Sequence, residues 1–332
     1  MSEIRIDPLT GQRTILAELR AGRPGSGLPG TGATGAPGGG ATGAPEDPFA
    51  EGNEARTPPE LYAVRPDGSA PDTPGWRVRV VPNRYPALDP DAGDPPPSEN
   101  PDLFWSGAAG GAHELIINAP EPVGSLAQLD PSQVALAADV WRERMRAHPD
   151  AACLHLLVNE GPDAGASIAH THAQLFALDF VPAAIARERE RFGAYATRTM
   201  GGNLLGDLLQ QEVRRRERVI AIDSDAVLLA TWAAHVPYQL MIIPRRPRMR
   251  FEEDGPTAAT LLHDGLSRLR RRLGEDAAVN LWVRTAPQGA EHFCWRIDIV
   301  PRLTHLAGFE LGTGVGLNVV APERAAAELR DA

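Results

Sequence analysis

Two stretches of the chain carry the same order of predicted elements, and this repeat constrains the fold more than any other feature. The first predicts a strand, a helix and two strands at 113–118, 131–147, 154–159 and 170–178, and the second predicts them at 239–244, 256–273, 279–284 and 292–300. The spacing agrees, since Leu115 to Leu156 is 41 residues and Met241 to Leu281 is 40. Both helices place their apolar residues on one face. The pattern predicts an α+β fold of two tandem units, each an antiparallel sheet with a helix packed across it. A chance likeness of two α+β segments is the alternative.

The remaining segments place the boundaries. Residues 4–19 have β-branched side chains around a turn at 8–11, which predicts a short strand pair. Gly, Pro, Ala and Thr dominate 21–45, and we expect a flexible insertion there, because such a stretch buries too little apolar surface to offset its ordering entropy. The proline-rich stretch 89–102 predicts an exposed connector. We assign 1–178 to an N-terminal unit and 179–332 to a C-terminal unit.

Composition excludes several classes of reaction. All 33 basic residues among the 332 are arginine. A GC-rich genome explains the absence of lysine, but the chemical consequence stands. Walker-type phosphate loops, pyridoxal enzymes, Schiff-base aldolases and lysine-adenylating ligases all need a lysine amine. With 43 acidic residues the net charge is −10, so we do not expect nucleic acid as a partner.

Cysteine content and hydropathy indicate the compartment. Cys153 and Cys294 are too few for a disulfide framework or a four-cysteine zinc site. The first residues lack the apolar core of a signal peptide, and no apolar run approaches the roughly 18 residues of a membrane span. We therefore expect a soluble, cytoplasmic protein that has no membrane partner.

The strongest local pattern lies between residues 159 and 174. If 170–178 is a strand, His170, His172 and Gln174 project from one of its faces. Three polar groups on one face of a buried strand are costly unless something binds them. The preceding turn contains Gly161, Gly165 and the Ser167 hydroxyl and can bring backbone N–H groups near an anion. The pattern predicts a phosphate site beside an imidazole.

Two other interpretations of the histidines stay open. They can be a metal pair that His113 or His155 completes, or they can be core histidines with satisfied hydrogen bonds. Glutamine is a poor zinc ligand but a good donor to a phosphoryl oxygen, so Gln174 favours the phosphate site.

With these residues the chain resembles the galactose-1-phosphate uridylyltransferases of the histidine-triad superfamily. The resemblance covers most of the chain and rests on blocks at 5–11, 20–24, 81–88, 170–174 and 301–314. It implies two histidine-triad-like units whose sheets run together, with the site on the histidine strand of the first unit. It also implies a homodimer.

The resemblance implies a role for individual residues. The family transfers a uridylyl group by a ping-pong route in which the second histidine of the motif becomes nucleotidylated. His172 would be that nucleophile, with His170 beside it, while Gln174 and Ser167 would hold the non-bridging oxygens. The other residues that match substrate-binding positions are Asn159 and Gly165 in the phosphate pocket, Asn83 near the nucleoside, Arg20, Arg23 and Arg84 as phosphate-binding cations, and Glu310.

The chain also departs from the family. The zinc-binding cysteines are replaced by Asp47 and Ala50, and Pro122 stands at the position of a zinc-binding histidine, so only His170 remains of the four ligands. We therefore predict no metal and no cofactor. In the second repeat, Arg296 replaces a histidine, which predicts a degenerate second site. The segment after Gly314 lacks a Tyr-Glu pair that sugar-selective members have, so the acceptor stays open.

Four hypotheses for function follow. The leading one is a nucleotidyltransferase that moves UMP, or another nucleoside monophosphate, between a nucleotide sugar such as UDP-glucose and a sugar 1-phosphate. The second is a phosphorylase of an ADP-sugar or a dinucleoside polyphosphate. The third is a nucleotide-binding protein without turnover, and the fourth is a metal hydrolase.

Overall fold

The computed structural model describes residues 2–17, 20 and 47–332. The insertion predicted at 21–45 lies outside the described residues, as does Arg23. The predicted strand pair near the start is confirmed: β1 (Glu3–Ile6) pairs antiparallel with β2 (Arg13–Leu16), and β5 (Ser106–Ala108) adds a third strand on the other side of β1.

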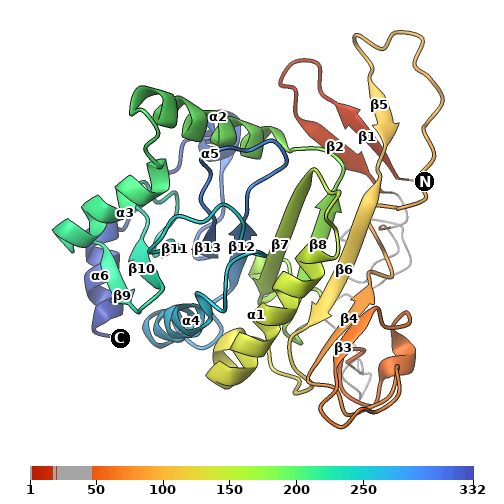
Figure 1. The fold of residues 1–332 in the computed structure, drawn as a ribbon, viewed down its shortest axis with the longest axis horizontal. Coiled ribbons are helices and arrows are strands. Elements are labelled where there is room, and N and C mark those ends of the chain that lie inside the picture. Colours follow the sequence, from red (N-terminus) through yellow and green to blue (C-terminus); the bar gives the residue numbers. More distant parts are fainter. Residues whose placement is uncertain (1, 18–19, 21–46) are drawn as a thin grey trace.

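The other ten strands form one antiparallel sheet in the order β3-β4-β6-β8-β7-β12-β13-β11-β10-β9 (Figure 1). The strands are β3 (Tyr62–Val64), β4 (Val78–Pro82), β6 (Gly111–Ile117), β7 (Cys153–Glu160), β8 (His172–Leu178), β9 (Val219–Ile222), β10 (Ala226–Ala230), β11 (Leu240–Pro244), β12 (Val279–Arg284) and β13 (Arg296–Pro301). The predicted α+β class is confirmed.

The repeat is visible in the strand order. The first copy runs β6-β8-β7 across the sheet and the second runs β11-β13-β12, so the same three strands neighbour one another in both. β7 and β12 pair antiparallel, with Asn159 opposite Asn280, which joins the two copies into one sheet. The unit boundary between 178 and 179 falls at the end of β8, and the division into two domains stays a prediction.

The main core lies on one face of this sheet. Helices α1 (Pro131–Arg146) and α4 (Ala259–Leu273) lie side by side there, and α6 (Pro322–Arg330) packs against α4. Trp141 of α1 and Leu262 of α4 are fully buried against alternate residues of the central strands, such as Leu156 and Leu281. The apolar residues that alternate along the strands and those on one face of α1 and α4 therefore form one core.

The opposite face carries several smaller, separate clusters, one of which packs Leu88 and Ile185 against Cys153 and Leu178. Over the second repeat, α2 (Ala183–Arg198) and α3 (Leu204–Arg215) pack through Phe192, Leu205 and Leu209. Over the first repeat, Phe49 and Trp76 pack on alternate residues of β4 and β6. The sheet face that carries His172 is therefore covered by the segment that begins at residue 47.

Three predicted elements begin at least two residues later than expected. The strand predicted from 170 begins at His172, so His170 precedes the strand and does not project from it beside His172 and Gln174. The helix predicted from 256 begins at Ala259, because Ala258 has φ +79°, outside the helical region. The strand predicted from 292 begins at Arg296, and His292 has φ +59°, which a strand cannot continue. Short 3₁₀ turns lie at Glu54–Arg56, Leu126–Gln128 and Pro162–Ala164, and a short helix α5 spans Gly308–Thr313. Among the described residues, no helix is both long and apolar enough to span a bilayer.

Candidate functional site

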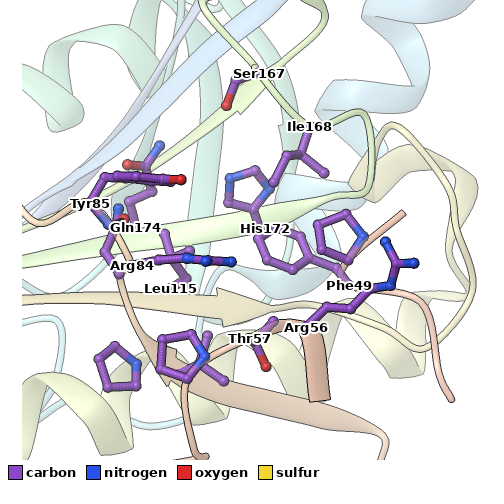
Figure 2. Close-up of a pocket in the computed structure, with 15 residues that line it drawn as sticks. Phe49, Arg56, Thr57, Arg84, Tyr85, Leu115, Ser167, Ile168, His172 and Gln174 are labelled. Carbon is purple, nitrogen blue, oxygen red and sulfur yellow. Dashed lines mark hydrogen bonds between the residues drawn. The ribbon is translucent and has the colours of Figure 1, made fainter. Parts of the chain in front are cut away.

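A pocket of about 220 Å³ opens on the sheet face opposite α1 and α4. It lies where β4, β6 and β8 meet the segment that begins at residue 47 and the turn before β8. The lining residues are Pro48, Phe49, Arg56, Thr57, Pro58, Val81, Pro82, Asn83, Arg84, Tyr85, Leu115, Ser167, Ile168, His172 and Gln174. Figure 2 shows the His172 ring among these side chains, with Gln174 and Arg84 on one side and Ile168 and Arg56 on the other.

His172 is the first residue of β8 and is largely buried. Its ring packs against the Phe49 ring in a T-shaped arrangement, with 5.0 Å between the ring centroids. Its Nδ1 lies 2.8 Å from the backbone oxygen of His170. A carbonyl oxygen only accepts hydrogen bonds, so Nδ1 carries the proton and the lone pair of the neutral ring resides on Nε2. The backbone thus selects the tautomer in which Nε2 is nucleophilic.

Gln174 lies two residues further along β8, on the same face as His172. Its Oε1 is 3.3 Å from Nε2 of His113, a buried histidine that stacks on Phe176. Nδ2 of Asn83 lies 3.0 Å from the same His113 nitrogen. His113 therefore contacts both side-chain amides of the pocket, which does not match its alternative role as a third metal ligand.

His170 is placed behind the pocket and does not line it. Its Nδ1 is 2.7 Å from Asp47 Oδ2, and its Nε2 is 2.8 Å from the backbone oxygen of Ala119. The other proposed partner, His155, lies opposite Arg284 on β12. Burial and the Arg284 charge lower the pKa of His155 to about 4. Within residues 2–17, 20 and 47–332, no three His, Cys, Asp or Glu side chains gather as a metal-binding group.

The glycine turn reaches the pocket through Ser167 and Ile168. Gly161 and Gly165 both have φ +82°, a conformation that glycine adopts without strain. A Cβ on Gly161 would also stand 3.1 Å from the Ala278 Cα. The Gly165 N–H donates to the Pro162 oxygen, so the turn uses this donor internally. The role of Gly165 as a phosphate contact stays a prediction.

The other predicted substrate residues divide into two groups. Asn83 and Arg84 line the pocket, and Arg20 donates to the backbone oxygen of Tyr85 at 2.8 Å, which holds the neighbouring loop. Asn159 and Glu310 do not line it. The Asn159 oxygen accepts from Asn280 across the β7–β12 junction, and Glu310 caps its own helix α5 by accepting from the Ala307 N–H.

The corresponding place in the second repeat is filled by an ion-pair network. By register, Arg296 and Asp298 on β13 occupy the positions of His172 and Gln174 on β8. Arg296 donates to both oxygens of Asp298 and pairs with Glu188 of α2. Burial opposes the charge of Arg296, but Asp298 and Glu188 outweigh it and raise its pKa. The second copy has a salt bridge where the first has an imidazole.

Several lining residues were not predicted, chiefly Phe49, Arg56, Thr57, Tyr85 and Ile168. Tyr85 belongs to the block at 81–88 that the resemblance already used, and Ile168 lies inside the histidine motif. The other three lie at 49–57, a segment whose sequence carries no motif that indicates a substrate pocket. Their proximity to His172 arises only when that segment folds over the sheet.

The chain was compared with known proteins. The model of the galactose-1-phosphate uridyl transferase N-terminal domain matches residues 69–182. An ADP-glucose phosphorylase of Arabidopsis thaliana is 28% identical over 341 residues, which cover 99% of this chain and 92% of that protein. A galactose-1-phosphate uridylyltransferase of Cryptococcus neoformans is 26% identical over 98% of this chain and 89% of its own.

Solved structures give the same result. The crystal structure of an Arabidopsis thaliana ADP-glucose phosphorylase with bound ADP-glucose matches with a TM-score of 0.74 and 27% identity, covering 100% of this chain and 99% of that one. A uridylyltransferase structure matches with a TM-score of 0.78 at 22% identity and supports the fold alone. The resemblance stated from the sequence is confirmed.

Proposed function

Because the chain belongs to the galactose-1-phosphate uridylyltransferase family, we propose that it transfers a nucleoside monophosphate from a nucleotide sugar through a covalent intermediate on His172. One observation carries the proposal: the His172 ring lines the pocket, and its Nδ1 faces a carbonyl oxygen 2.8 Å away. That contact makes Nε2 the nucleophilic nitrogen. Gln174 and Ser167, which line the same pocket, are then the candidate donors to the phosphate oxygens.

The first half-reaction begins when Nε2 of His172 attacks the α-phosphorus. The bond from that phosphorus to the oxygen bridging the two phosphates breaks, and the sugar 1-phosphate leaves with the bonding electrons. Positive charge develops on the imidazole, and the Nδ1–H bond to the His170 oxygen stabilises it. Donors fixed in the pocket stabilise the charge that builds on the non-bridging oxygens, as in other phosphoryl and acyl transfers.

In the second half-reaction a phosphate oxygen of the acceptor attacks the same phosphorus, and the bond to Nε2 breaks. The ring returns to its neutral state. Arg84 and Arg56, which line the pocket, are the candidate cations for the phosphates. An arginine fork suits phosphate because it donates two parallel hydrogen bonds. No lysine exists in the chain to share this task.

The acceptor separates two versions of this chemistry. With a sugar 1-phosphate the products are a new nucleotide sugar and the released sugar 1-phosphate. With inorganic phosphate the product is a nucleoside diphosphate, and a relative named ADP-glucose phosphorylase that aligns over 99% of this chain favours this second version. Both versions share the nucleotidyl-His172 intermediate.

The test is a donor and acceptor matrix. UDP-glucose and ADP-glucose are each incubated with galactose 1-phosphate or inorganic phosphate, and products are separated by ion-exchange chromatography. Nucleoside diphosphate that appears only with phosphate identifies a phosphorylase, and exchanged nucleotide sugar identifies a uridylyltransferase. If neither donor reacts although both shift the melting temperature, the protein binds nucleotides without turnover and the proposal is wrong.

A further inference from the structure

Asp47 stands where hydrogen-bond donors from two distant parts of the chain converge. Its Oδ2 lies 2.7 Å from Nδ1 of His170, and its Oδ1 accepts from the Phe49 N–H at 2.9 Å. Its backbone oxygen accepts from the Asn53 side chain at 2.7 Å. The Asp47 side chain is 26% exposed, whereas the His170 side chain is fully buried. The Asp47 carboxylate therefore connects the segment at 47–53 to His170, two residues before the nucleophile His172.

The second contact of His170 fixes its ring from the other side. Its Nε2 lies 2.8 Å from the backbone oxygen of Ala119. Both ring nitrogens therefore have a partner, and the buried ring cannot turn without losing the contact to Asp47 or the contact to Ala119.

This pair reaches the nucleophile by two routes. The backbone oxygen of His170 accepts from Nδ1 of His172, so the position of His170 sets the tautomer and orientation of the His172 ring. Phe49, whose N–H bonds to Asp47, packs its ring edge-on against both histidines, with centroid distances of 6.3 Å to His170 and 5.0 Å to His172. Asp47 therefore holds two contacts of the reactive imidazole.

The donor set does not fit the zinc ion that the family resemblance implies. Ala50 and Pro122 stand at two of the four ligand positions and offer no side-chain donor. Ligands at about 2.0–2.1 Å from a tetrahedral zinc lie roughly 3.3 Å apart. Asp47 Oδ2 and His170 Nδ1 are 2.7 Å apart, which is the length of a charge-assisted hydrogen bond. The two remaining residues bind each other.

We propose that Asp47 is a positioning residue for His172, and that its direct hydrogen bond with His170 fixes the segment at 47–53 to the nucleophile strand without a metal. This inference rests on the proposed function, since it assigns His172 as the reacting group. Beyond that function, the inference assigns a role to Asp47, which acts through His170 and Phe49 and does not contact the substrate.

The test compares Asp47→Asn with a matched carboxylate variant, Glu51→Gln. Asparagine has one oxygen, so it cannot accept from both the Phe49 N–H and His170 as the carboxylate does. Glu51 is exposed in the same segment and accepts from the Gly75 N–H, a bond that glutamine retains. We expect D47N to slow formation of the covalent nucleotide about 10- to 100-fold, as for residues that orient a reactive ligand. E51Q should match the wild type.

Metal content is measured on the wild-type protein and needs no variant. The expected result is substoichiometric zinc by plasma mass spectrometry and a rate of nucleotide attachment that EDTA does not change. Stoichiometric zinc in the wild type that is lost in D47N would overturn the proposal, because Asp47 and His170 would then be metal ligands.

A readout without activity keeps this inference separate from the proposed function. Hydrogen exchange of the peptide covering 47–54 should be faster in D47N than in the wild type and unchanged in E51Q. If the wild type takes no nucleotide from any donor, the proposed function fails while this comparison still tests the contact between Asp47 and His170. Unchanged exchange in D47N would contradict the pairing.

Discussion

Arg79 is a buried arginine that bonds to Thr57 in the wall of the pocket, and its replacement gives the largest stability effect that we predict. The residue is 1% exposed on β4. Its Nε lies 3.1 Å from Glu60 Oε2, one terminal nitrogen lies 2.6 Å from Asp72 Oδ1, and the other donates to Thr57 Oγ1 at 2.7 Å. Thr57 lines the pocket, so the network links stability to the shape of the site.

Replacing Arg79 by methionine fills a similar volume and leaves Glu60 paired with Arg65. Removing one partner of a buried ion pair costs about 3–5 kcal/mol when the other charge is left without compensation. Because Arg65 still pairs with Glu60, we expect about 2–3 kcal/mol, the scale of lost hydrogen bonds to charged groups. We expect this loss in the free energy of unfolding, measured by urea denaturation at neutral pH. A matched variant, Arg77→Met, changes an exposed arginine that bonds to Gln133 and should cost about 1 kcal/mol.

The pH dependence supplies a second check. Burial opposes ionisation of Glu60, but the hydrogen bonds from Arg65, Asp72 and Arg79 prevail and hold its pKa below 4.5. A lowered folded-state pKa contributes stability above about pH 4.5, and the contribution is lost as the pH falls. Arg79→Met should lose less stability on acidification than the wild type. If Arg79→Met lowers the free energy of unfolding by less than about 1 kcal/mol at neutral pH, no more than Arg77→Met does, the buried Arg79 network does not stabilise the fold as proposed.

Three further predictions concern single side chains. Gln174→Met retains volume but removes the carboxamide, so formation of the covalent nucleotide should slow about 10²- to 10³-fold in rapid-quench experiments, and an unchanged rate would exclude Gln174 from catalysis. Burial raises the pKa of both Cys153 and Cys294 to about 11, so the folded protein should resist Ellman's reagent near pH 8 and both thiols should react in urea. Burial opposes ionisation of Glu114, but Arg144 prevails and lowers its pKa. Glu114→Gln should therefore flatten the loss of unfolding free energy as the pH falls below about 4.5, and an unchanged pH slope would contradict this assignment.

Local periodicity was enough to predict the repeated frame. Strand residues such as Leu156 and Leu281 and the apolar faces of α1 and α4 are determined by their own neighbours in sequence, and they were assigned correctly. Two of the boundaries were wrong where a single residue takes a positive φ. Ala258 and His292 do so, and nothing in their side chains distinguishes them from residues of regular elements.

The site was predictable only where its residues share one motif. His172, Gln174 and Ser167 lie within eight residues, and alternation along β8 puts the first two in the same pocket. Asp47 pairs with His170, which lies 123 residues away in the sequence, and no local pattern predicts such a contact. The ion pairs that Glu188 of α2 makes over the second repeat are equally non-local. The homodimer, the cytoplasmic location and the absence of nucleic-acid partners stay predictions.

The most direct test of the account is the intact mass of the protein after mixing with a nucleotide sugar and no acceptor. We expect the chain to gain one nucleoside monophosphate, which proteolysis should locate on His172 and which acid should release as expected for a phosphorus–nitrogen bond. His172→Ala should gain nothing although it still binds the donor. An adduct that persists in His172→Ala, or wild-type turnover without any adduct, would contradict the central claim.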